Sequence, residues 1–289
     1  MTCDLPAASP AADPAAASPA AGDPAAGTPA YGPATYGDGF ADVYDDWYAD
    51  VGDPDATATT VAELAGDGRV LELGVGTGRL ALAIAAAGVA VDGVDASAAM
   101  LDRLAAKDPS ASVGRFLGDI ADDLPPGPYR VVFAACNTFF NLVSEAAQLR
   151  CLRAVVERLE PQGVLVVEGF VPDAAGRPGP DHLAGEDGWP HVESRLHGRS
   201  LLLNVTTHDV GRQLVRGRHI EVRLDGAGPV SDIARIRPWQ IRYLAPSQLD
   251  ELAGAAGLEP AHRWADWRRT PFEATDTQHV SVYAHAGRG

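Results

Sequence analysis

Cysteine is scarce in this chain, which has three cysteines among 289 residues and no C-x-x-C pair. Three is an odd number, and the spacing gives no sign of a disulfide framework, so a reducing cytoplasmic compartment is expected. Long apolar runs are also lacking. No stretch of about 18 apolar residues occurs, and the first residues have neither a basic start nor a leucine-rich segment, so we expect no membrane span and no secretory signal.

Basic side chains are few as well. The chain carries 23 basic and 39 acidic side chains, which gives a net charge of −16, and Lys107 is its one lysine. A nucleic-acid substrate would require a basic surface to meet its phosphates. The charge therefore argues against a nucleic-acid partner.

Residues 1–35 lack the pattern of a folded core. They consist almost entirely of Ala, Pro, Gly, Ser and Asp, without aliphatic periodicity. Such a segment buries too little apolar surface to offset the entropy lost on ordering. We therefore expect a disordered tail, followed by a core over residues 36–172 and 245–289.

The most informative stretch lies at residues 70–78. Val70–Leu73 has the composition of a buried strand, glycines follow at positions 74, 76 and 78, and a helix is expected over Arg79–Ala87. Glycine lets a ligand approach the backbone closely, and a helix N-terminus offers unpaired N–H groups. The dinucleotide fingerprint G-x-G-x-x-G does not fit, because Arg79 occupies its third glycine position.

Strand and helix patterns alternate after this turn, which predicts βαβ units, a parallel sheet and a ligand at the carboxyl ends of its strands. Asp95 lies 21 residues after Gly74, about where doubly wound folds place a ribose-binding carboxylate. The alternatives that involve no ligand are that Asp95 caps the helix that follows it and that Asp119 is a turn residue. The expected elements are strands at Val89–Asp95, Val113–Leu117, Tyr129–Ala135 and Val164–Glu168, and helices at Ala98–Lys107 and Glu145–Leu159.

Residues 173–244 are interpreted as an antiparallel insertion. Its location after the fifth strand predicts a cover over a pocket for a small polar molecule, and packing against the open sheet is the alternative. The expected strands are His191–Leu196, Ser200–Asp209, Gln213–Leu224 and Ile233–Leu244. A helix at Gln248–Ala256 and strands at Leu258–Trp264 and His279–Ala284 are expected to complete the main sheet.

The string E-x-G-x-G-x-G, from Glu72 to Gly78, resembles motif I of the class I S-adenosylmethionine-dependent methyltransferases. Ala41–Tyr48 is similar to the N-terminal lid of the TDP-amino-sugar N,N-dimethyltransferases. Asn137–Phe140 is similar to the N-T-F-F stretch of the cypemycin-type peptide N-methyltransferases. The resemblance covers residues 40–170 and implies an α/β fold, a Rossmann-like doubly wound seven-stranded methyltransferase sheet with an antiparallel β insertion after strand five.

The resemblance also implies S-adenosylmethionine as the cofactor. Asp95 would take the ribose hydroxyls, Asp119 would reach the adenine amino group, and Tyr48 would contact the methionine moiety. The expected cofactor-binding residues are Tyr48, Glu72, Gly74, Gly76, Gly78, Asp95, Ala96, Met100, Asp119, Ile120, Ala135 and Cys136.

Methyl transfer from a sulfonium is an in-line displacement, so positioning carries much of the catalysis. An amine needs only to be presented deprotonated, whereas a hydroxyl usually needs a base or a metal. The strand ends at Ala135–Asn137 and Glu168–Gly169 lack the ligand pattern of a catechol-type metal site, so no metal is expected. No catalytic residue is assigned, and the candidates are Tyr48, Glu168, His191 and His219.

The sequence therefore predicts an enzyme that methylates a small metabolite or a peptide terminus, with N-methylation favoured and no metal. Two alternatives remain, a small-molecule O-methyltransferase and a non-catalytic scaffold that binds S-adenosylmethionine. The expected partner is the methyl acceptor, with no nucleic acid and no membrane, and a homodimer is the assembly considered.

Overall fold

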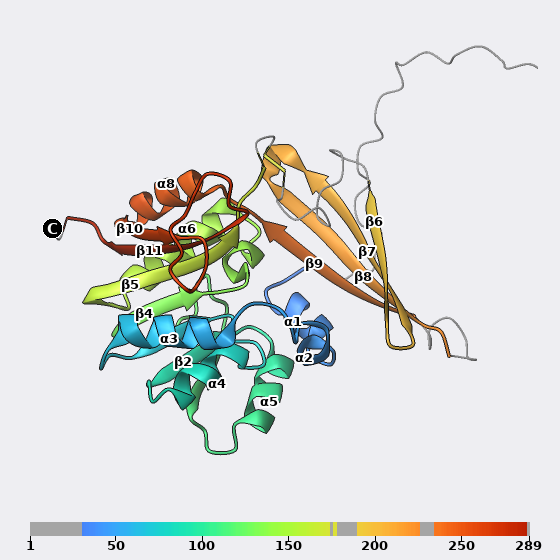
Figure 1. Ribbon diagram of the computed structural model, residues 1–289, viewed down its shortest axis with the longest axis horizontal. Coiled ribbons are helices and arrows are strands. Elements are labelled where there is room, and N and C mark those ends of the chain that lie inside the picture. The colour runs from blue at the N-terminus through green and yellow to red at the C-terminus, as the bar shows by residue number, and fades with distance from the viewer. Residues whose placement is uncertain (1–30, 174–175, 178–189, 226–233, 288–289) are drawn as a thin grey trace, which may run out of the picture. The chain divides into compact units, whose positions relative to one another are not determined.

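The computed structural model describes residues 31–173, 176–177, 190–225 and 234–287. Contacts divide the chain into residues 1–32 and 33–289, and every helix and strand described below belongs to the second unit (Figure 1). The tail predicted for residues 1–35 lies, up to residue 30, outside the described residues, as do parts of the insertion predicted for 173–244. The first helix begins at Thr35.

A seven-stranded sheet forms the centre of the second unit, in the order β10-β11-β5-β4-β1-β2-β3. Strand β11 runs antiparallel to both of its neighbours, β5 and β10, and the remaining pairs are parallel. This confirms the predicted fold class. The strands are β1 (Val70–Leu73), β2 (Val91–Asp95), β3 (Val113–Leu117), β4 (Tyr129–Ala134), β5 (Leu159–Phe170), β10 (Leu258–Trp264) and β11 (Gln278–His285).

Strand β5 is longer than the predicted Val164–Glu168. It pairs with β4 on one side and with β11 on the other, and β11 is more than a hundred residues away in the sequence. Pairing along both edges satisfies backbone N–H and C=O groups that the local sequence pattern leaves unassigned. The extension is therefore a consequence of tertiary pairing.

Helices pack on both faces of this sheet. Two of them, α3 and α4, share an apolar cluster with one face, whereas α6 and α8 share a cluster with the other. Side chains cap two of these helices, since the Asp53 carboxylate accepts from Ala56 N at 3.0 Å and Ser97 Oγ accepts from Met100 N at 3.2 Å. The helices are α3 (Pro54–Ala65), α4 (Arg79–Ala86), α5 (Ala98–Lys107), α6 (Glu145–Val156) and α8 (Pro246–Ala256), with the 3₁₀ turn η1 at Thr138–Asn141. Within the described ranges, none of the helices is both long and apolar enough to cross a bilayer.

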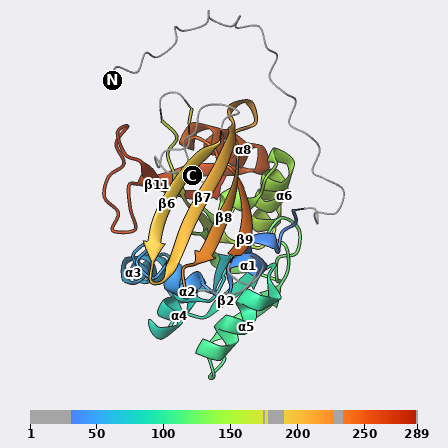
Figure 2. The same cartoon turned by 90° about the vertical axis from the view of Figure 1, so that its right-hand side faces the viewer.

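A second sheet is formed by the inserted strands, in the order β6-β7-β8-β9, with every pair antiparallel (Figure 2). This confirms the antiparallel insertion predicted after strand five. We call it sheet B. Its strands are β6 (His191–His197), β7 (Ser200–Asp209), β8 (Leu214–Arg223) and β9 (Ala234–Arg242), with the 3₁₀ turn η3 at Val210–Arg212.

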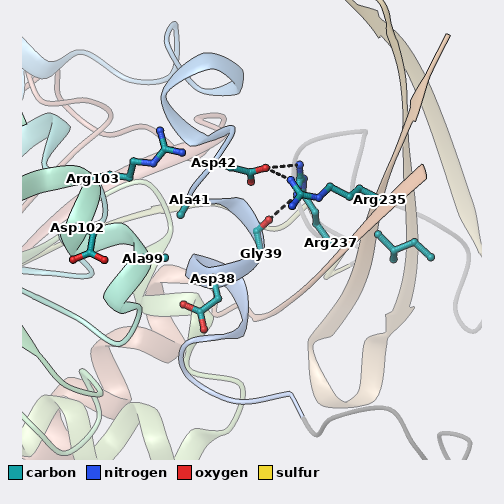
Figure 3. Close-up of a pocket in the computed structure, with 10 residues that line it drawn as sticks. Asp38, Gly39, Ala41, Asp42, Ala99, Asp102, Arg103, Arg235 and Arg237 are labelled. Carbon is teal, nitrogen blue, oxygen red and sulfur yellow. Dashed lines mark hydrogen bonds and ion pairs between the residues drawn. The ribbon is translucent and has the colours of Figure 1, made fainter. Parts of the chain in front are cut away.

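Two short helices, α1 (Thr35–Phe40) and α2 (Tyr44–Trp47), lie between the core and sheet B (Figure 1). We call residues 35–48, which contain both helices, the lid. Helix α1 contacts both α5 and β9. On the core side, Ser97 Oγ donates to Asp38 Oδ1 at 2.6 Å. A cavity of about 480 Å³ opens where α1, α5 and β9 meet (Figure 3).

Arg237 of β9 ties the lid to sheet B. Its guanidinium donates to the carbonyl of Gly39 at 3.0 Å and to the Asp42 carboxylate at 3.2 Å (Figure 3). It also donates to the Glu221 carboxylate at 3.1 Å. It also lies 5.2 Å from the centre of the Trp47 ring, as in a cation–π pair. The Arg237 side chain is only 4% exposed, so these acceptors replace its water.

We predict that Arg237→Met lowers the free energy of unfolding by about 2–3 kcal/mol, since it leaves two carboxylates without their buried partner. The matched control is Arg216→Met on the exposed face of the neighbouring strand, which should change stability by less than about 0.5 kcal/mol. Urea titration followed by circular dichroism measures both. An equal loss of unfolding free energy in the two variants would show that the Arg237 contacts do not stabilise the fold.

Candidate functional site

The three glycines of the turn after β1 all have a left-handed backbone conformation. Gly74, Gly76 and Gly78 have φ of +67°, +54° and +83°, values that side chains with a Cβ rarely adopt. A Cβ on Gly74 would overlap the Thr138 methyl group, whereas a Cβ on Gly76 would meet nothing nearer than a backbone oxygen at 4.0 Å. The turn is therefore packed at Gly74 and open at Gly76, where a ligand has access to the backbone.

Asp95, at the end of β2, holds this turn in place. One carboxylate oxygen accepts from Gly76 N at 2.8 Å, and the other accepts from Ser97 N at 2.8 Å. Burial raises the pKa of Asp95, and the two N–H donors oppose that rise. The carboxylate thus lies beside the open glycine and in front of the first turn of α5.

Glu72, in β1, is a second acid beneath the turn. Its side chain is 5% exposed, and its Oε2 has no hydrogen-bond partner among the described residues. Burial raises the pKa of Glu72 well above its ordinary value, although the charge of Arg79 opposes that effect. Buried polar atoms in proteins are normally hydrogen-bonded, so this oxygen is available to a bound molecule.

Arg79, the first residue of α4, is a site residue that the sequence analysis did not assign. Its Nη2 donates to Cys136 Sγ at 3.3 Å and its Nη1 donates to the carbonyl of Val51. Its Nε is buried without a hydrogen-bond partner in the part of the chain that the structure describes. Among the described residues this cation donates to a thiol and a carbonyl and to no carboxylate, so it can bind an anion. The sequence feature that could have identified Arg79 is its position directly after the third glycine of the turn.

The end of β3 joins the same edge. Gly118 N donates to the carbonyl of Asp95 at 3.0 Å, and Asp119 accepts from Ala121 N at 2.9 Å. Ile120 is 8% exposed and Met100, in the first turn of α5, is 2% exposed. Ala96 is half-buried between Asp95 and the α5 cap. The predicted adenosine-side residues are thus brought to one edge of the sheet.

The end of β4 turns sharply into η1. Cys136 and Asn137 have φ of +52° and +63°, and Ala135 just before them is 4% exposed. Two residues of this edge hold the turn, because Glu168 Oε2 accepts from Cys136 N at 2.6 Å and Asn137 Oδ1 accepts from Phe170 N at 2.8 Å. Burial, and then the Glu168 charge, raise the pKa of the Cys136 thiol to about 12, so it is not a thiolate at neutral pH.

The lid supplies two tyrosines to this site. The Tyr44 and Tyr48 rings are 4.9 Å apart, and burial raises the pKa of both phenols. The titration of Tyr44 is coupled electrostatically to Cys136, Arg79 and Glu72, so that phenol lies near all three groups. Both phenols stay protonated at neutral pH, so Tyr48 is a hydrogen-bond donor there and not a base.

Asp45 is a second lid residue that the sequence analysis did not assign. It accepts from Thr77 Oγ1 at 2.6 Å and from Lys107 Nζ at 2.9 Å. Although burial raises it, the pKa of Asp45 is lowered overall because of these two donors. The lid is thereby fastened to the glycine turn itself. The resemblance of Ala41–Tyr48 to a methyltransferase lid drew attention to Tyr48, but no local pattern indicates a partner for Asp45.

The two candidate histidines lie apart on sheet B. His219 of β8 packs against Phe40, Trp47 and Trp239, with ring centroids 5.4, 5.9 and 6.2 Å away. His191 begins β6, and its Nε2 is buried without a hydrogen-bond partner in the described structure. The third candidate base, Glu168, has its Oε2 engaged with the β4 turn. Within the described ranges, no three His, Cys, Asp or Glu side chains gather as a metal site.

Comparisons with known proteins agree on one kind of domain. Residues 70–163 match a family described as a methyltransferase domain. The chain is 39% identical to the CcbJ methyltransferase from Streptomyces caelestis, and the match covers 89% of this chain and 100% of that one with a TM-score of 0.78.

Two further relatives extend this likeness. The cypemycin N-terminal methyltransferase of a Streptomyces species is 36% identical over 116 residues, which is 40% of this chain and 47% of that protein. This chain therefore spans about half the length of the curated relatives it matches. A methyltransferase from Clostridium acetobutylicum has a TM-score of 0.71 at 14% identity over 86% of this chain and 99% of that one, so it shares the fold.

The glycine turn offers a stability test. Gly74→Ala should cost about 2–4 kcal/mol of unfolding free energy, because it combines positive φ with an overlap on Thr138. Gly88→Ala, where φ is +87° and no atom lies within 4 Å of the added Cβ, should cost only about 1 kcal/mol. Adding Thr138→Ser to Gly74→Ala, which removes the overlapping methyl, should recover part of the loss. Equal losses at the two glycines would refute the packing argument.

Proposed function

We propose, from the premise that this chain belongs to the class I S-adenosylmethionine-dependent methyltransferases, that it transfers a methyl group to an amine nitrogen of a small metabolite or a peptide terminus. The full-length likeness to a methyltransferase supports the transfer. The choice of an amine as the methyl acceptor rests on the similarity, over 116 residues, to an N-terminal methyltransferase. The structural observation that supports cofactor binding is the Gly76 backbone, which is open to a ligand beside the Asp95 carboxylate.

The residues at the strand ends suit S-adenosylmethionine. Gly76 leaves room for close approach, and the half-buried Asp95 carboxylate beside it would accept hydrogen bonds from the two ribose hydroxyls. Adenine would lie against the buried Ile120 and Met100, with Asp119 toward its amino group. The remaining proposed contacts are Gly74, Gly78, Ala96, Ala135 and Cys136.

The methionine moiety of S-adenosylmethionine would meet groups of complementary charge below the lid. The unpartnered Glu72 oxygen would face the ammonium group, and the poorly partnered Arg79 cation would face the carboxylate. Tyr44 and Tyr48 would cover this end from the lid. When bound, the cofactor supplies a methyl group on a sulfonium, which is electrophilic without further activation.

The protein's part in catalysis is then to position the acceptor and exclude water. A free amine already carries its lone pair, so alignment with the methyl carbon supplies much of the rate. The lid, closed between the core and sheet B by Asp38, Asp45 and Arg237, keeps water from the reacting atoms. Sheet B serves as the acceptor cover. Independence from metals, a homodimer and a cytoplasmic location remain predictions.

The cofactor assignment is tested by calorimetry with S-adenosylhomocysteine. We expect micromolar affinity, and no binding of NAD. Gly76→Ala should weaken the affinity at least about tenfold, whereas Gly88→Ala, which introduces comparable backbone strain far from the site, should leave it unchanged. Binding of NAD alone, or full affinity in Gly76→Ala, would contradict the assignment.

The acceptor class is tested with a labelled methyl donor and a panel of amino sugars, simple amines, short peptides and phenols. Amines should be methylated, and their rate should rise with pH as the acceptor loses its proton, until another group titrates. Treatment with EDTA should leave the rate unchanged. Methylation confined to hydroxyls would overturn the amine assignment, and dependence on added Mg²⁺ would overturn the proposed mechanism.

A further inference from the structure

Strand β6 presents one face to the lid. Side chains alternate along a strand, so His191, Glu193, Arg195 and His197 share a face. His197 Nε2 lies 2.7 Å from Asp46 Oδ2 of α2. This contact identifies the shared face as the one that meets the lid. We call it the inner face of sheet B.

Among the buried polar atoms of the inner face that have no hydrogen-bond partner in the described structure are His191 Nε2 and Thr206 Oγ1. The two residues stand directly opposite each other in the β6–β7 register. His191 Nε2 is 3.9 Å from the Glu193 carboxylate, too far for a hydrogen bond. Thr206 is 1% exposed. Because buried polar atoms in proteins are normally hydrogen-bonded, two neighbouring atoms without partners point to a ligand that hydrogen-bonds to both.

Arg195 lies on the same face, four residues beyond His191 and so about 13 Å along the strand. Within the described residues it has neither an ion pair nor a hydrogen bond. Its positive charge nevertheless acts on the Tyr48 phenol, where it opposes the rise in pKa that burial causes. Arg195 therefore lies near the lid tyrosine that we assign to the methionine end of the cofactor site.

The charge of sheet B is opposite to that of the chain. The described residues 190–225 and 234–242 contain nine arginines and four carboxylates, whereas the chain as a whole has 23 basic and 39 acidic side chains. Most of the nine arginines are paired with carboxylates. Arg216 and Arg218 are unpaired in the described structure but lie on the opposite face, since the intervening Gly217 packs against Trp239.

We infer that the inner face of sheet B binds a methyl acceptor that carries an anionic group, with Arg195 holding a carboxylate or phosphate and His191 and Thr206 hydrogen-bonding a polar group about 13 Å away. This inference rests on the proposed function. A guanidinium forms two parallel hydrogen bonds to either anion, which makes it the suitable anchor. An acceptor that reaches both places is longer than a single amino acid.

The test compares paired acceptors that differ in charge. Trialanine with a free carboxylate is compared with its C-terminal amide, and glucosamine 6-phosphate with glucosamine, so the two arms separate a carboxylate from a phosphate. Binding to the full-length protein saturated with S-adenosylhomocysteine is measured by calorimetry, and methylation is measured with a labelled donor. In at least one pair, the charged member should bind about 10- to 100-fold more tightly, the usual scale for a hydrogen-bonded charge.

Arg195→Gln should remove this preference and raise KM for the charged acceptor. It should leave kcat, and the affinity for the neutral acceptor, unchanged. Arg218→Gln, an unpaired arginine on the other face, should retain the preference. The preference should also shrink as salt is raised, because Arg195 is exposed. Thr206→Val should weaken binding of both members of a pair equally.

Equal affinity within both pairs, or no binding of any charged probe, would overturn the inference, as would a preference that survives Arg195→Gln. If a charged probe binds through Arg195 but receives no methyl group, the proposed function fails while the anion site stands. If amines are methylated without regard to their charge, the proposed function stands and the anion site fails.

Discussion

The hydrogen bond from Gly76 N to the Asp95 carboxylate organises the functional edge of this protein. It joins the turn after β1 to the end of β2, and it requires positive φ at the surrounding glycines. Because neighbouring parallel strands end at one edge, β3, β4 and β5 bring their own termini to the same place. The glycine turn is therefore closely packed at Gly74 and open to a ligand at Gly76.

Acidic side chains fasten the lid over that edge from two directions. Asp38 and Asp45 bind Ser97 and Thr77 of the core, while Asp42 and Asp46 bind Arg237 and His197 of sheet B. Each bond spans elements that are distant in the sequence. The lid thus links the edge of the seven-stranded sheet to sheet B through helices of six and four residues.

Much of the fold follows from local pattern. The glycine spacing and the alternation of strands with helices are short-range features, and the seven-stranded sheet with its antiparallel insertion confirms the prediction made from them. The length of β5 was underestimated, since pairing with β11 is a long-range contact. The assignments of Asp95, Glu72 and Tyr48 to a cofactor remain predictions that the geometry supports.

The sequence by itself determined the class of this protein, because motif, periodicity and capping act over a few residues and can be read in order along the chain. Only the tertiary structure decided which side chains meet. Arg79 beside Cys136, Asp45 beside Thr77 and Lys107, and His191 opposite Thr206 are pairs made by strand register and helix packing. No local pattern encodes such pairs, since each depends on the three-dimensional placement of elements that are separated along the chain.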